Sequence, residues 1–143
     1  MDDLPASVRQ LLDKPYPAVV ATTGGPDSPQ CSVIWIEREG NDLSFFCEPF
    51  TVKARNLRRY PSVVVIVVDP VRTFEPGAPC YVRIRGRASL EAMNDTSFQD
   101  RLAQRYMGLT AFPHKGDYLR VRIASESWSG LGPFPDTPHG WGQ

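Results

Sequence analysis

The sequence lacks the residues that cross-link or anchor a protein. Its three cysteines, Cys31, Cys47 and Cys80, are widely spaced and form no C-x-x-C pair. An odd, scattered set argues against a disulfide framework and favours free thiols in a reducing compartment. No apolar run reaches the roughly 18 residues that a membrane span needs, and the first residues carry no basic segment followed by a signal-like apolar stretch. We therefore expect a soluble cytoplasmic protein without a membrane partner.

Net charge and familiar catalytic motifs are also missing. The 16 basic and 16 acidic residues cancel, which argues against a protein held on nucleic acid by charge alone. The two histidines, His114 and His139, are not spaced like metal ligands, so no metal is predicted. The sequence contains no G-x-S-x-G, Walker A or Rossmann fingerprint. These absences disfavour nucleic-acid binding, metal chemistry and the common hydrolase and nucleotide-binding classes.

The pattern of short β-rich runs predicts a mainly β, α+β fold. The length of 143 residues indicates one domain, 1–143, whose Gly/Pro-rich end, 127–143, is expected to be coil. Short β-rich runs bounded by turn residues predict an antiparallel meander. The run "SVVVIVVDP" is apolar on both faces, which predicts a central strand. About six such strands and two or three helices predict a six-stranded antiparallel barrel with helices packed outside.

One basic segment, "TVKARNLRRYP", stands out from the neutral chain. It is predicted to be a helix that begins at Thr51 and ends before Pro61. Lys53 then lies in the first turn, where the helix dipole makes a cation unfavourable by roughly a few tenths of a kcal/mol. A bound anion reverses that sign, because backbone N–H groups, the Thr51 hydroxyl and the Lys53 ammonium would converge on it. The alternative is an ordinary surface lysine.

The other cations of this segment have simpler interpretations. Arg58 and Arg59 fall in the last turn, where the dipole favours them, and are expected to be solvated. Arg55 fits either a site or a surface. Asn56 is a poor helix former, and a ligand or a neighbouring strand could hold its amide. Binding of nucleic acid through "KARNLRR" is disfavoured, because few aromatic residues are interleaved with the cations.

The same segment resembles a known family. "TVKARNLRRYPSVVVIVVDP" is similar to the T-x-K-x-R-N-L-R-x-x-P segment of the pyridoxamine 5′-phosphate oxidase-like split β-barrel superfamily. More narrowly, it resembles the deazaflavin-dependent reductase branch, which uses coenzyme F-420. The likeness spans most of residues 5–130. It continues, in family order, through "AVVATTGGPDSPQCSVIWIE", "YVRIRGRASL", "LAQRYMG" and "YLRVRIASESWSG".

The resemblance implies an FMN-binding split-barrel fold and a homodimer with two cofactor sites at the subunit interface. Lys53 would hold the cofactor phosphate, with Thr51, Arg55 and Asn56 as helpers. The other implied site residues are Gln30 and Ser32 beside the ring system, Cys47 and Glu48 at the border of the cofactor, and Tyr81, which the partner subunit would offer.

The resemblance also implies an oxidoreductase. True pyridoxamine phosphate oxidases carry a C-terminal segment rich in Arg, His and Trp, and "GPFPDTPHGWGQ" does not match it. The expected function is therefore hydride transfer from reduced F-420 to a small unsaturated or conjugated organic substrate. The alternatives are an FMN-dependent oxidoreductase and a non-catalytic flavin-, deazaflavin- or haem-binding protein. Water, Tyr81 or Tyr106 would supply a proton, and His114 is expected to be an exposed loop residue.

Overall fold

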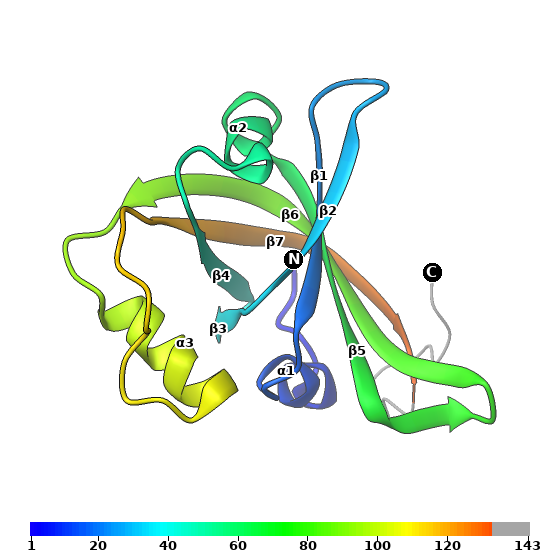
Figure 1. The fold of residues 1–143 in the computed structure, drawn as a ribbon. Coiled ribbons are helices and arrows are strands. Elements are labelled where there is room, and N and C mark those ends of the chain that lie inside the picture. The colour runs from blue at the N-terminus through cyan, green and yellow to red at the C-terminus, as the bar shows by residue number, and fades with distance from the viewer. Residues whose placement is uncertain (133–143) are drawn as a thin grey trace.

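A computed structural model describes residues 1–132, except for the side chain of Phe74. Three helices surround one antiparallel sheet (Figure 1). The elements in chain order are α1 (Ala6–Leu12), β1 (Ala18–Thr23), β2 (Pro29–Ile34), β3 (Glu37–Glu39), β4 (Asp42–Cys47), α2 (Val52–Arg59), β5 (Ser62–Glu75), β6 (Ala78–Ala92), α3 (Ser97–Met107) and β7 (Leu119–Leu131).

The sheet is curled by a short link between its two edges. Its strand order is β2-β1-β5-β6-β7-β4-β3, so β2 and β3 are the opposite edges. Only Trp35 and Ile36 separate these two strands in the sequence. Because the three residue steps from Ile34 to Glu37 span at most about 11 Å, the edges must approach each other where the chain crosses. The sheet therefore coils toward a barrel, although no ladder joins β2 to β3 within the described chain.

The prediction of a six-stranded barrel is wrong in its number of strands and in its closure. The sheet has seven strands and is not closed. The additional strand is β3, in which Glu37–Glu39 pairs with Ser44–Asp42 of β4. The sequence predicts one strand over "QCSVIWIE" and a turn at "REGND", so a separate short strand was not expected. Ile36, which is fully buried, lies between the end of β2 and the start of β3.

The end of the chain also departs from the expectation. β7 continues to Leu131, so the first part of segment 127–143 is strand rather than coil. Its residues pair with β6, as in Ile84 with Trp128 and Tyr81 with Leu131. The long partner strand supplies backbone hydrogen bonds that do not depend on the apolar pattern of the added residues. The remainder of the expected coil, 133–143, lies outside the described residues.

Strand β5 is internal to the sheet and buried on one face. β5 lies between β1 and β6, as its apolar sequence predicts. Val63, Val65 and Val67 point into the core. Their neighbours on the other face are only half-buried or, at Val68, 43% exposed. The single chain therefore leaves apolar side chains of β5 on the outer face of the sheet, next to Arg83 and Arg85 of the paired strand β6.

Gly86 is required by a close approach between β6 and β7. The register of this pair shifts between Arg85 and Gly86. A side-chain carbon at Gly86 would overlap the carbonyl oxygen of Ala124 and the side chain of Ile123. Only glycine lets the two backbones meet at this bulge.

Helix α3 forms an ion pair with β3, the strand that follows the link through Trp35 and Ile36. Its Arg101 donates to both carboxylate oxygens of Glu37 on β3, at 3.0 and 3.1 Å. The Arg101 guanidinium holds the pKa of Glu37 below its ordinary value, against the opposing effect of partial burial. The helix ends at Gly108, whose φ of 70° suits glycine. Helix α3 is thus held against the strand that follows the link.

Candidate functional site

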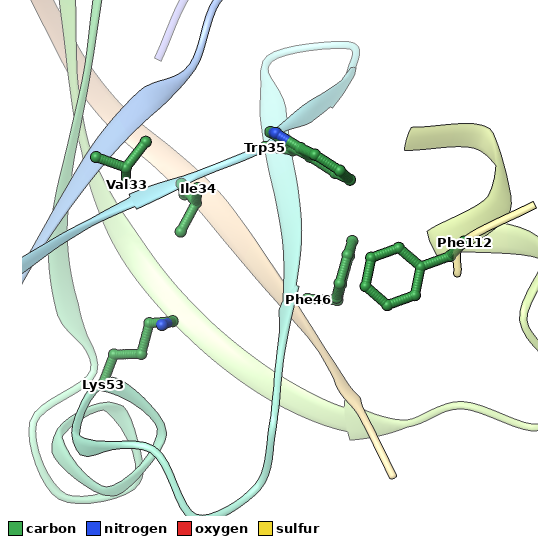
Figure 2. A pocket seen from close by; sticks show the side chains of 6 residues that line it. All are labelled: Val33, Ile34, Trp35, Phe46, Lys53 and Phe112. Carbon is green, nitrogen blue, oxygen red and sulfur yellow. The ribbon is translucent and has the colours of Figure 1, made fainter. Parts of the chain in front are cut away.

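Helix α2 begins as its sequence predicts and directs Lys53 toward a cavity. Thr51 is the N-cap, because its hydroxyl accepts from the Ala54 N–H at 3.3 Å. Ala54 and Leu57 are buried where the helix packs on the sheet. Figure 2 shows the Lys53 side chain rising from α2 toward β2 and β4. The cavity has a volume of about 240 Å³ and is lined by Val33, Ile34, Trp35, Phe46, Lys53 and Phe112.

The charge at this end of the cavity is not balanced. Lys53 is half-buried, and no hydrogen bond or ion pair joins it to any residue in the described part of the chain. The first turn of α2 has no acidic residue. The first helical bond is donated by Arg55, so the N–H groups of Val52 and Lys53 precede the intrahelical pattern. This combination of donors suits an anionic group such as a phosphate.

Aromatic side chains form the wall farther from Lys53. Trp35 comes from the link between β2 and β3, Phe46 from β4 and Phe112 from the segment between α3 and β7. The Trp35 ring meets the rings of Phe46 and Phe112 edge-on, with centroids 6.3 Å away in both cases. Figure 2 shows Phe46 and Phe112 side by side across the cavity from Lys53. The cavity therefore joins one cation to a surface suited to an apolar, planar group.

A buried polar chain lies beneath α2. The Asn56 amide donates to the Thr22 hydroxyl at 3.1 Å, and that hydroxyl donates to Gln30 Oε1 at 3.2 Å. Gly24 leaves room for Asn56, since a side-chain carbon there would lie 2.9 Å from Asn56 Oδ1. On the same face of β2, the Ser32 hydroxyl is buried without a hydrogen-bond partner among residues 1–132. The Asn56 amide is thus held by β1. A neighbouring strand was one of the two partners expected for this amide, and the other was a ligand.

Three of the expected site residues form the cap of α2. Thr51 donates its hydroxyl to the carbonyl of Glu48 at 3.0 Å, while the Glu48 side chain is exposed. Burial raises the pKa of the Cys47 thiol, although the Thr51 hydroxyl and Lys53 oppose this shift. Cys47 therefore stays a neutral thiol at neutral pH. These residues lie near the Lys53 end of the cavity, at the start of α2, and do not line it.

The remaining predicted residues lie apart from the cavity. Arg55 is exposed. Arg58, expected to be a solvated cation, donates to the Pro49 carbonyl at 2.8 Å and so holds the loop before α2. Arg59 lies over the ring of Tyr60. Tyr81 pairs with Val68, which places it on the outer face of the sheet. Of the expected cofactor residues, only Lys53 lines the cavity.

Tyr106 and His114 are the two remaining titratable residues considered from the sequence, and one is half-buried while the other is exposed. The Tyr106 hydroxyl accepts from Ile36 N–H at 3.2 Å and lies 3.3 Å from the carbonyls of Tyr16 and Ile36. Burial raises its pKa, and its hydroxyl is engaged with backbone groups on two segments. His114 is exposed, as expected, with its ring 5.5 Å from that of Phe112.

Sequence reasoning missed the aromatic wall. Trp35 precedes β3 and Phe46 lies in β4, both shortly before the basic segment in the sequence, so their positions were available as a signal. Phe112 follows α3 in an irregular segment, and no local pattern directs it toward β2 and β4. No group of three or more His, Cys, Asp or Glu side chains is placed to hold a metal in the described residues. No described helix is long and apolar enough to cross a membrane.

Comparisons with known proteins identify the family of this fold. Residues 4–131 match the family model described as pyridoxamine 5′-phosphate oxidase. The chain belongs to this family. It therefore has the fold of a group of flavin- and deazaflavin-type oxidoreductases, as its sequence resemblance implied.

Three solved structures of this fold illustrate its range. An F-420 reductase is 25% identical, with a TM-score of 0.75, over 88% of this chain and 98% of that one. General stress protein 26 from Bacillus anthracis is 16% identical, with a TM-score of 0.63, over 86% and 89% of the two chains. A heme binding protein from Mycobacterium smegmatis is 15% identical, with a TM-score of 0.69, over 89% of this chain and 53% of that one. The last two show the fold alone. A comparison with curated proteins gives no significant match.

A double-mutant cycle tests the polar chain beneath α2. Asn56→Ala and Thr22→Val should each lower the free energy of unfolding by about 1–3 kcal/mol, because each leaves a buried polar partner unpaired. The double variant should lose about 1 kcal/mol less than the sum of the single losses. Chemical denaturation gives these values. Exposed Asn94→Ala is the matched control and should show no coupling to Thr22→Val, and strict additivity for Asn56 would contradict the contact.

Proposed function

We propose that this protein is an F-420-dependent oxidoreductase that transfers hydride to a small unsaturated or conjugated organic substrate. The observation that carries the proposal is Lys53, an unpaired and half-buried cation at a helix N-terminus, facing a cavity whose far wall is aromatic. F-420 bears a phosphate on one side and a planar deazaflavin on the other, so its two chemical parts match the two ends of the cavity. The similarity to an F-420 reductase supports the same choice.

The two ends of the cavity would hold the two parts of the cofactor. The Lys53 ammonium and the N–H groups of the first turn of α2 hold the phosphate. The N-cap bond of Thr51 fixes that turn, and the Asn56 contact fixes α2 on β1. The aromatic wall excludes water from the ring. When bound, F-420 supplies a two-electron hydride donor that reacts little with oxygen. Solvent supplies the proton, because the Tyr106 hydroxyl is engaged with backbone groups.

The cofactor choice is tested by direct titration. F-420 should bind the purified protein more tightly than FMN, measured from the fluorescence of each ligand. Reduced F-420 should then be oxidised in the presence of an acceptor from a panel of enones, quinones and tetrapyrroles, and not in its absence. Tighter binding of FMN, with turnover by reduced FMN, would replace this proposal by an FMN-dependent oxidoreductase. Binding without turnover would leave a carrier protein.

The role of Lys53 predicts a specific loss of affinity. Losing a charge-assisted contact to phosphate costs on the order of 1.5–3 kcal/mol. Lys53→Ala should therefore weaken F-420 binding about tenfold to hundredfold, while unfolding stays cooperative. Affinity of the parent should fall with salt, because the contact is partly exposed. Arg59→Ala is the matched control, since Arg59 lies in the last turn of the same helix. A larger loss from Arg59→Ala than from Lys53→Ala would place the phosphate elsewhere.

The proposal includes a homodimer with cofactor sites at the interface. Val19 of β1 pairs with Val33 and with Ile66, so the three side chains share the outer face of the sheet. Val33 is 69% exposed and Val68 43% exposed. An exposed apolar strip of this kind favours association with a second copy of the chain. Tyr81 lies on that face beside Val68 and is assigned to the partner's site.

Light scattering tests the dimer. The protein should have twice the mass of its 16.0 kDa chain at micromolar concentration. Val33→Glu should shift it toward the monomer, because the carboxylate would be desolvated in the interface. Met107→Glu, at another exposed apolar residue on α3, should leave the mass unchanged. A parent that scatters only as a monomer would refute the interface.

A further inference from the structure

Trp35 occupies an unusual position in the fold. It lies in the two-residue link between the edge strands β2 and β3, and its indole lines the cavity that Lys53 enters. A side chain in a short link between strands has no regular ladder to orient it. Its orientation must therefore come from tertiary contacts.

Tyr106 supplies these contacts. Its ring stacks on the Trp35 indole with a centroid distance of 5.3 Å and an interplanar angle of 8°. Its hydroxyl accepts from the Ile36 N–H and lies within hydrogen-bond distance of the Ile36 and Tyr16 carbonyls. One residue of α3 thus covers one face of the indole and also fixes the backbone beside it.

The remaining contacts complete the orientation. Phe46 and Phe112 meet the Trp35 ring at angles of 73° and 89°, in T-shaped contacts. Tyr106 already covers one indole face, and the indole still lines the cavity. A planar ligand in the cavity therefore reaches an aromatic surface whose plane is set before the ligand binds. Such preorganisation lowers the entropic cost of stacking.

We propose that Trp35 is the ring-stacking residue of the candidate cofactor site and that Tyr106 is a positioning residue that fixes its plane. The inference rests on the proposed function in one respect, which is that a ring-bearing ligand occupies this cavity. It adds that different residues recognise the two parts of the ligand: Lys53 recognises the phosphate, and the Trp35–Tyr106 pair recognises the ring.

The experiment compares F-420 with its phosphate-free deazaflavin chromophore. Dissociation constants and the fluorescence quenching of the bound ring at saturation are measured for both ligands. Trp35→Leu should weaken both ligands equally, by about tenfold, and should relieve part of the quenching. Lys53→Ala should weaken F-420 only. The ratio of the two dissociation constants therefore separates the phosphate contact from the ring contact.

Tyr106→Phe separates positioning from structural support. Phenylalanine keeps the stacking surface but loses the bonds to the link. It should weaken both ligands about threefold and change the quenching at saturation, with an unaltered ratio between the ligands. Trp35→Phe should retain part of the affinity and serves as the milder variant if Trp35→Leu unfolds. Tyr60→Phe, a tyrosine outside the cavity lining, is the matched control.

Different results would refute the proposed function and the ring-stacking role of Trp35. If the parent binds neither ligand, the proposed function and this inference both fall. If the parent binds both ligands and Trp35→Leu or Trp35→Phe keeps the parent's affinities and quenching, only the inference falls. If Tyr106→Phe lowers the melting temperature without changing quenching or affinity, Tyr106 is a structural residue and its positioning role is refuted.

Discussion

The two-residue link between β2 and β3 is the constraint on which the site depends. These strands are the opposite edges of the sheet, so a connection through Trp35 and Ile36 forces the sheet to coil. Ile36 is fully buried at this point, and its N–H donates to Tyr106. A longer connection would permit a flatter sheet and leave the indole without a fixed plane. The link therefore determines both the shape of the fold and one wall of the cavity.

The cavity combines two kinds of recognition that arise from different levels of structure. The charged end is local: Thr51 caps α2, and Lys53 follows two residues later. The aromatic end is assembled from segments far apart in the sequence, because Trp35 is covered by Tyr106 and bordered by Phe112. Burial of Asn56 against Thr22 holds α2 on β1 beside this cavity. The arrangement favours a ligand with an anionic tail and a planar head.

The sequence predicted the features that depend on short-range patterns. The N-cap at Thr51, the position of Lys53 in the first turn and the internal place of β5 all follow from local rules. The contact of Tyr106 with Ile36 joins residues 70 positions apart, and no periodicity reports it. β3 was hidden because three residues are too few to show alternation. The strand at the end of β7 was hidden by its Ser- and Gly-rich composition, since backbone pairing with β6 supports it.

A crystal structure with F-420 bound would test the central claim most directly. The account predicts phosphate oxygens within hydrogen-bond distance of Lys53 Nζ and of the first N–H groups of α2. It also predicts a deazaflavin ring stacked on the face of Trp35 that Tyr106 does not cover, with Tyr106 still covering the other face. A phosphate bound at Arg58 or Arg59, or a ring bound away from Trp35, would contradict it.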